Sequence, residues 1–198
     1  MTPLHAKARR EGGFALIEVL VSFVILVFGL LGLAGIGSRA NLAEMESYQR
    51  SQALAILQDM AERLNANRKV PSCYSNGVTG QEAGNGVDPA TLPACLVGTA
   101  QERAQANADL RAWDALLRGQ AESAAGANLG AMIGAVGCIT LDDAPTNTYM
   151  IAVSWQGLVQ TAAPLIDGGT AFPCGNGAYG NEKLHRVVTT KVRIGALS

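Results

Sequence analysis

The feature that most constrains this chain is an unbroken apolar run, FALIEVLVSFVILVFGLLGLAGIG, over residues 14–37. Glu18 is its only ionisable side chain. A helix over these residues measures about 36 Å, and the hydrocarbon core of a bilayer is about 30 Å thick. The run therefore predicts a helix that is long enough to cross a membrane.

The flanks of this run indicate its orientation. Lys7, Arg9 and Arg10 precede it, and basic residues beside a spanning helix favour the cytoplasmic side, so the rest of the chain is expected on the other side. A cleaved secretory signal is the alternative, since Ser38-Arg39-Ala40 imitates a cleavage site. Such signals have an apolar region of about 7 to 15 residues, which is shorter than this run.

Glu18 needs an explanation, because a carboxylate at the centre of a bilayer helix costs roughly 2.5 to 3.5 kcal/mol on insertion scales. In an uncut anchor, Glu18 lies about one turn from Phe14 and could reach the interface. A cut between Gly13 and Phe14 would instead create a cationic amine. In a staggered, parallel assembly, Glu18 of one molecule could pair with the amine of the next and set the register.

A short basic leader that ends in glycine, followed by GFALIEVLVSFVILVFGLLGLAGIG, resembles the class III signal of type IV pilins and of type II secretion pseudopilins. The resemblance implies that a prepilin peptidase cleaves after Gly13, that Phe14 is N-methylated and that Glu18 acts in assembly. Ala15 stands where threonine is usual, a mild departure. The implied organisation is a leader over 1–13, a transmembrane and filament-core helix over 14–37, and a periplasmic globular domain over 38–198.

Glycines recur at four positions within the apolar run, namely Gly29, Gly32, Gly35 and Gly37. Glycine weakens a helix but permits close backbone approach, so this part could be a packing seam or a locally unwound stretch. The family resemblance implies unwinding in the assembled filament.

The helix is expected to continue to about residue 68, because the polar segment after the run has no proline and is rich in helix formers. An apolar stripe, interrupted by Gln49, predicts that this part covers a core. Its members are Leu42, Met45, Ala53, Ile56, Leu57, Met60 and Leu64. Residues 70–99 are predicted to form a loop. A second helix is predicted from about 101 to 123, and its apolar side carries Leu110, Trp113, Leu116 and Leu117.

The pattern then changes to that of strands. An antiparallel hairpin is predicted over 138–142 and 148–156, and HRVVTTKVRIG at 185–195 predicts a final strand. The order of elements predicts an α+β fold, in which a long N-terminal helix packs on one face of an antiparallel sheet with a second, short helix. This order also resembles the pilin globular domain.

All four cysteines follow the apolar run and none forms a CxxC pair, which favours disulfides outside the cytoplasm over a zinc site. Four cysteines permit three connectivities, which the sequence alone does not distinguish. We expect the sequence-local pairing of Cys73 with Cys95 and of Cys138 with Cys174.

The sequence favours no enzyme and no nucleic-acid partner. His185 is the only histidine beyond the leader, Asp142 and Asp143 are neighbours that point to opposite faces of a strand, and no common catalytic motif is present. We therefore expect no catalytic residue, no metal and no cofactor. The formal net charge is −1 without a basic patch.

Over most of the chain, GLLGLAGI, DLRAWDALL, a hairpin ending in Trp-x-Gly and RVVTTKVRI resemble PilV-type minor pilins. The resemblance implies a protein that helps prime type IV pilus assembly at the inner membrane and enters the pilus, supporting twitching motility and surface attachment. Implied partners are other minor and major pilins, the prepilin peptidase and the assembly machinery. The alternatives are a type II secretion minor pseudopilin and, in another class, a membrane-anchored periplasmic enzyme or ligand-binding module.

Overall fold

The computed structural model describes residues 14–88, 90, 95–120, 123–124, 127–128, 132–166 and 168–195. It divides into two compact units, Met1–Glu44 and Met45–Ser198. Gly13, at the predicted cleavage boundary, lies outside the described residues.

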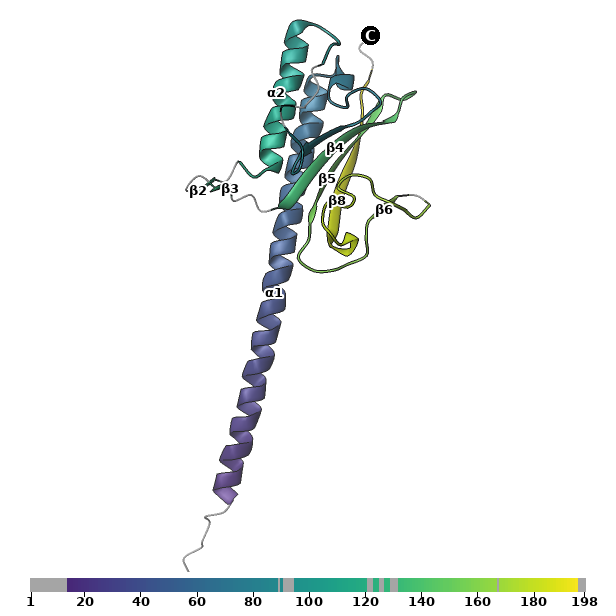
Figure 1. The fold of residues 1–198 in the computed structure, drawn as a ribbon. Helices are drawn as coiled ribbons and strands as arrows, with labels where there is room; N and C mark the ends of the chain where they lie inside the picture. Colours follow the sequence, from purple (N-terminus) through teal and green to yellow (C-terminus); the bar gives the residue numbers. More distant parts are fainter. Residues whose placement is uncertain are drawn as a thin grey trace, which may run out of the picture. The chain divides into compact units, whose positions relative to one another are not determined.

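The first helix, α1, runs from Phe14 to Ala66 without a break (Figure 1). The expectation of one long helix through the apolar run and into the polar segment is confirmed, and the helix ends at Ala66. Its backbone stays helical through residues 29–37, so the four glycines do not interrupt it in the single chain. The implied unwinding concerns the assembled filament and stays a prediction.

The second unit is built on a four-stranded antiparallel sheet in the order β1-β4-β5-β8. Its strands are β1 (Gln81–Gly84), β4 (Ile133–Asp143), β5 (Thr148–Gln156) and β8 (His185–Arg193). The predicted hairpin and final strand are confirmed, although β4 starts earlier than expected. Two small ribbons pair β2 (Ser123–Ala124) with β3 (Ala127–Asn128) and β6 (Leu165–Ile166) with β7 (Thr170–Ala171).

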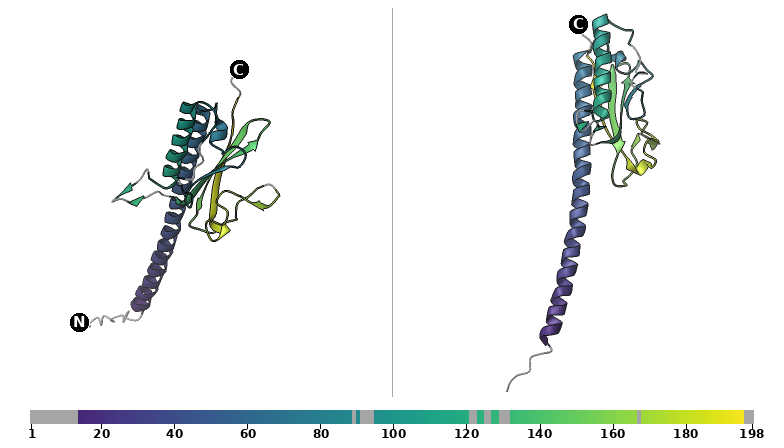
Figure 2. Two further views of the ribbon diagram at one scale, coloured as in Figure 1. Left: turned by 45° about the horizontal axis from the view of Figure 1, so that its top comes forward. Right: turned by 60° about the vertical axis from the view of Figure 1, so that its left-hand side comes forward.

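The second helix, α2, spans Ala100–Leu117 and lies with the C-terminal part of α1 on one face of the sheet (Figure 2). It begins with a capping box, in which Thr99 and Glu102 satisfy each other's backbone N–H groups. The predicted end near residue 123 is wrong. The helix ends at Leu117 with Arg118 as its C-cap, and Gly119 follows with a φ of +72°, a left-handed conformation that stops the helix there.

Alternation along the strands divides the sheet into two faces. Ile139 of β4 lies opposite Ile151 of β5, and both are buried in the core that the helices cover. The other face carries a smaller cluster, which includes Ala152 and the loop residue Phe172. The expected α+β arrangement, a helix on an antiparallel sheet, is thereby confirmed.

Two details of the predicted body are corrected. Residues 70–99 are not all loop, because Pro71–Cys73 form a short 3-10 helix and Gln81–Gly84 form β1. A further 3-10 helix spans Glu182–Leu184, before β8. The buried stripe of α1 begins at Gln49, which is 3% exposed, while Leu42 and Met45 are 43% and 55% exposed. Leu42 and Met45 therefore do not join the core.

Candidate functional site

The apolar part of α1 is the most unusual surface of the chain. Among the described residues, α1 is the one helix long and apolar enough to cross a membrane. Its large apolar side chains are exposed, at Leu16, Ile17, Val19, Leu20, Val21, Phe23, Val24, Ile25, Leu26, Phe28, Leu30, Leu31, Leu33 and Ile36. A patch of this size on a protein marks a membrane or partner surface.

Glu18 lies on this exposed part of the helix, and no hydrogen bond or ion pair joins it to another described residue. Phe14 is the first residue of α1, and Gly13 precedes the described part. The structure thus places Glu18 one turn into the helix that begins at Phe14. A carboxylate here can accept hydrogen bonds from a cation on another molecule.

The four glycines of the apolar helix are not required by packing within the chain. A Cβ atom added at Gly29, Gly32, Gly35 or Gly37 would meet no described atom within 4 Å. Small residues on a helix surface let a second helix approach closely. This part of α1 is therefore suited to helix–helix contact with other molecules.

Glu46 fastens the loop after β5 to α1 within the second unit. Its Oε1 accepts hydrogen bonds from the backbone N–H groups of Leu158 at 2.9 Å and Val159 at 3.0 Å, and from Nη2 of Arg186 at 3.1 Å. Partial burial raises the pKa of Glu46, but the N–H of Val159 and the Arg186 charge outweigh it, so the pKa is lowered overall. The carboxylate is ionised at neutral pH and holds the loop.

Asp109 is the centre of a buried polar network between the two helices. Its carboxylate accepts hydrogen bonds from Nη1 of Arg63 at 2.9 Å, the hydroxyl of Tyr74 at 2.6 Å and Nε2 of Gln105 at 3.0 Å. Burial and the Asp109 carboxylate raise the pKa of Tyr74 well above its ordinary value. Arg63 also pairs with Asp59 at 2.7 Å, so the network is satisfied throughout.

The cysteines lie in two disulfides. Cys73, at the end of the 3-10 turn after α1, joins Cys95, with a Cα–Cα distance of 5.0 Å. Cys138 of β4 joins Cys174 at 5.9 Å and holds the Cys174 loop against the sheet face opposite the helices. These are the two sequence-local pairs. Both fasten loops to the regular elements of the second unit.

The residues that could suggest a catalytic or metal site lie apart from one another or have structural roles. His185 is buried, its Nδ1 lies 2.8 Å from Oε2 of Glu182, and its ring stacks at a tilt on Tyr179 at 5.2 Å. Asp142 pairs with Lys191 at 2.8 Å. No group of three or more His, Cys, Asp or Glu side chains suited to a metal occurs in the described part of the chain.

Sequence reasoning missed Glu46 and Asp109. One signal was available for Asp109, since it lies four residues before Trp113 on the apolar side of α2, where an unpaired charge would be costly. Glu46 had no such signal, because its partners lie more than 100 residues away in the chain.

Comparison with known families matches two parts of the chain. The family model described as type IV pilin Tt1218 matches residues 36–114, from the end of the apolar run through most of α2. The model described as prokaryotic N-terminal methylation motif matches residues 8–34, which contain Glu18 and the predicted cleavage position after Gly13. No curated protein and no solved structure gave a significant match.

Proposed function

Because the chain is a type IV pilin-like protein, anchored in the membrane by its N-terminal helix, we propose that it is a minor pilin. It helps to prime the assembly of type IV pili at the inner membrane and is then incorporated into them, so that it supports twitching motility and surface attachment. Its role is structural.

The observation that carries this proposal is the exposed apolar part of α1, which buries nothing in the single chain and carries one charge, Glu18. In the membrane, lipid covers these side chains, and in a filament the helices of other pilins would replace the lipid. A peptidase cut after Gly13 leaves a methylated amine on Phe14. Glu18 then pairs with that amine on a neighbouring subunit and sets the axial register.

The proposed organisation follows from these roles. Residues 1–13 are a cytoplasmic leader that is removed, residues 14–37 anchor the subunit, and residues 38–198 form the periplasmic head. The partners are other minor and major pilins, the prepilin peptidase and the inner-membrane assembly machinery. The head, which the Glu46 and Asp109 networks and both disulfides make rigid, presents the lateral contact surfaces.

Mass spectrometry of the chain purified from membranes tests the processing. We expect loss of residues 1–13 and one methyl group on Phe14. An intact leader would overturn the proposal, because the amine that pairs with Glu18 would not exist.

A deletion strain tests the assembly role. We expect loss of surface pili and of twitching, restored by the wild-type chain, and we expect the chain in filaments sheared from wild-type cells. Normal piliation together with a defect in protein secretion would instead assign the chain to a type II secretion pseudopilus.

A further inference from the structure

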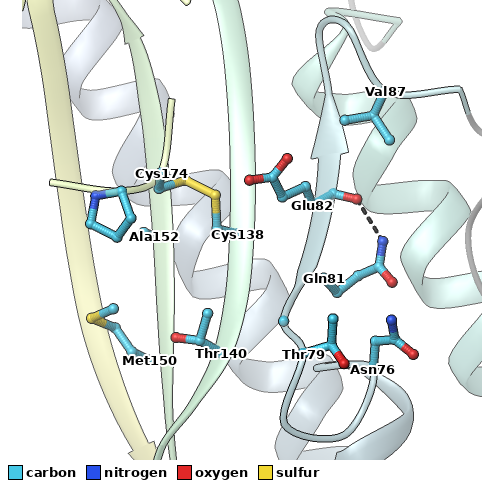
Figure 3. A pocket seen from close by; sticks show the side chains of 12 residues that line it. Asn76, Thr79, Gln81, Glu82, Val87, Cys138, Thr140, Met150, Ala152 and Cys174 are labelled. Atoms are coloured by element: carbon cyan, nitrogen blue, oxygen red, sulfur yellow. Dashed lines mark hydrogen bonds between the residues drawn. A yellow bond between two sulfur atoms is a disulfide. The ribbon is translucent and has the colours of Figure 1, made fainter. Parts of the chain in front are cut away.

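The second unit has a pocket of about 470 Å³ on the sheet face opposite the helices (Figure 3). Its floor is formed by β4 and β5, through Thr140 and Met150, and the Cys138–Cys174 disulfide lies along one side. Across from the disulfide stands β1, whose Glu82 side chain extends toward it (Figure 3). The volume is within the range of sites for small ligands.

The walls of this pocket are held in place by contacts with α2 and with the sheet. The backbone N–H of Gly84, at the end of β1, donates to Oδ1 of Asp114 on α2 at 2.7 Å. The carbonyl of Val87 accepts from Arg118. At the other end, a Cβ on Gly80 would lie 3.3 Å from Cγ2 of Thr140, so the chain passes close over the sheet there. The pocket is therefore preformed.

The charge of the pocket selects one kind of ligand. Glu82 is its only ionisable lining residue among those described, and its carboxylate forms no salt bridge or hydrogen bond with the described part of the chain. Lys191, a cation on the same face of the sheet, is held by Asp142 at 2.8 Å. A carboxylate without a cation in its own pocket attracts a cationic ligand and repels anions.

The uncharged polar side chains of the pocket also favour a ligand that donates hydrogen bonds. Gln81 does not contribute to them, because it pairs with the core residue Ile139 and its side chain lies on the helix-covered side of the sheet, where its Nε2 donates to the carbonyl of Glu82 at 2.6 Å. The hydroxyls of Thr79 and Thr140 add further acceptors.

From these observations we propose that the pocket binds a primary alkylamine, with its ammonium group at Glu82 and its aliphatic stem along Met150 and Ala152. The ammonium carries three donors and no acceptor, which matches a pocket rich in acceptors. The same chemistry is offered by a free diamine and by a lysine side chain. Glu18 is not part of this site.

Titrations of the full chain in detergent micelles test the site, with the Met150 methyl resonance in NMR as the readout. The probes are cadaverine for a free diamine and Nα-acetyl-lysine methylamide for a lysine side chain. Both are expected to shift the resonance saturably, and the tighter of the two identifies the source of the amine. Met60, in the core on the other sheet face, is the internal control and should not shift.

Matched variants and a neutral probe make the test decisive. Glu82→Gln should weaken amine binding at least tenfold, while Glu62→Gln, a change of an exposed carboxylate on α1, should leave it unchanged. Thr140→Val, which removes a hydroxyl from the pocket, should weaken amine binding several-fold. Nα-acetyl-norleucine methylamide, which lacks the ammonium, should not bind. No saturable shift with either amine, equal binding of the norleucine probe, or unchanged affinity in Glu82→Gln would each overturn the proposal.

Discussion

Trp113 donates its indole N–H to the backbone carbonyl oxygen of Ile56 at 3.1 Å, which ties α2 to α1 across the buried core. The ring is fully buried, and on its other side it lies against Gly137 of β4. Both contacts depend on the size and orientation of a single side chain. Trp113 therefore positions the two helices and the sheet of the second unit together.

The contact between Trp113 and Gly137 predicts a coupled pair of substitutions. A Cβ at Gly137 would overlap the far edge of the indole ring and Leu117, so Gly137→Ala should lower the free energy of unfolding by about 1 to 3 kcal/mol. Phenylalanine lacks those ring atoms. In a Trp113→Phe background, the same change should therefore cost less, as measured by urea unfolding in a double-mutant cycle.

Gly195→Ala is the control for this cycle, because a Cβ at Gly195 meets no described atom within 4 Å. It should leave stability unchanged. Strict additivity of Gly137→Ala and Trp113→Phe would show that the ring does not limit the space at Gly137.

The Asp109 network predicts unequal effects of two aspartates that bind the same arginine. Asp109→Asn leaves the Arg63 charge and the Tyr74 hydroxyl short of a buried acceptor, so the free energy of unfolding should fall by about 3 kcal/mol. Asp59→Asn removes a partner whose side chain is 34% exposed, and should cost less than about 1 kcal/mol. Urea unfolding measures both, and equal losses would refute the central role of Asp109.

Glu46 predicts a loss of stability in acid. Its pKa is lowered in the folded state, so its contribution is present above about pH 4.5, its ordinary value, and is lost as the pH falls through the folded value. Glu46→Gln should therefore lower the Tm at pH 7 and make little difference at pH 3. Glu44→Gln, an exposed neighbour on α1, is the control and should match the wild type at both pH values. An equal Tm difference for Glu46→Gln at pH 7 and pH 3 would count against the ion pair.

Glu18 predicts a defect in assembly without a defect in folding. Glu18→Ala removes the carboxylate proposed to meet the Phe14 amine of a neighbour, but Glu18 makes no contact that stabilises the head. The variant should reach the membrane in normal amounts with an unchanged Tm, and its amount in sheared filaments should fall at least tenfold. Ser22→Ala, one turn further along the same exposed helix, should assemble normally. Normal incorporation of Glu18→Ala would rule out the pairing.

Helices and strands whose apolar residues recur at a regular spacing were predictable from the sequence. The apolar run and its polar continuation predicted α1, alternating residues predicted β5 and β8, and the apolar side of α2 predicted the buried position of Trp113. In each case, the same residues that form the element also bury its inner face, so local pattern and tertiary packing agree.

Other features depend on distant partners and left no local pattern. β1 is four residues long and is a strand because it pairs with β4, more than 50 residues later. Arg186 lies 140 residues beyond Glu46, and the pocket beside Glu82 combines four segments of the chain. The cleavage boundary after Gly13 stays a prediction from the signal motif, because Gly13 lies outside the described residues.

The pairing of the cysteines has a consequence for how the chain is made. Cys95 precedes Cys138 in the chain, so in N-to-C-terminal export the Cys73–Cys95 bond can close while only those two cysteines have emerged on the oxidising side. The later pair, Cys138 and Cys174, then finds no free thiol upstream. Closure in this order would favour the observed pairing over the two other connectivities, because each cysteine meets its sequence-local partner first.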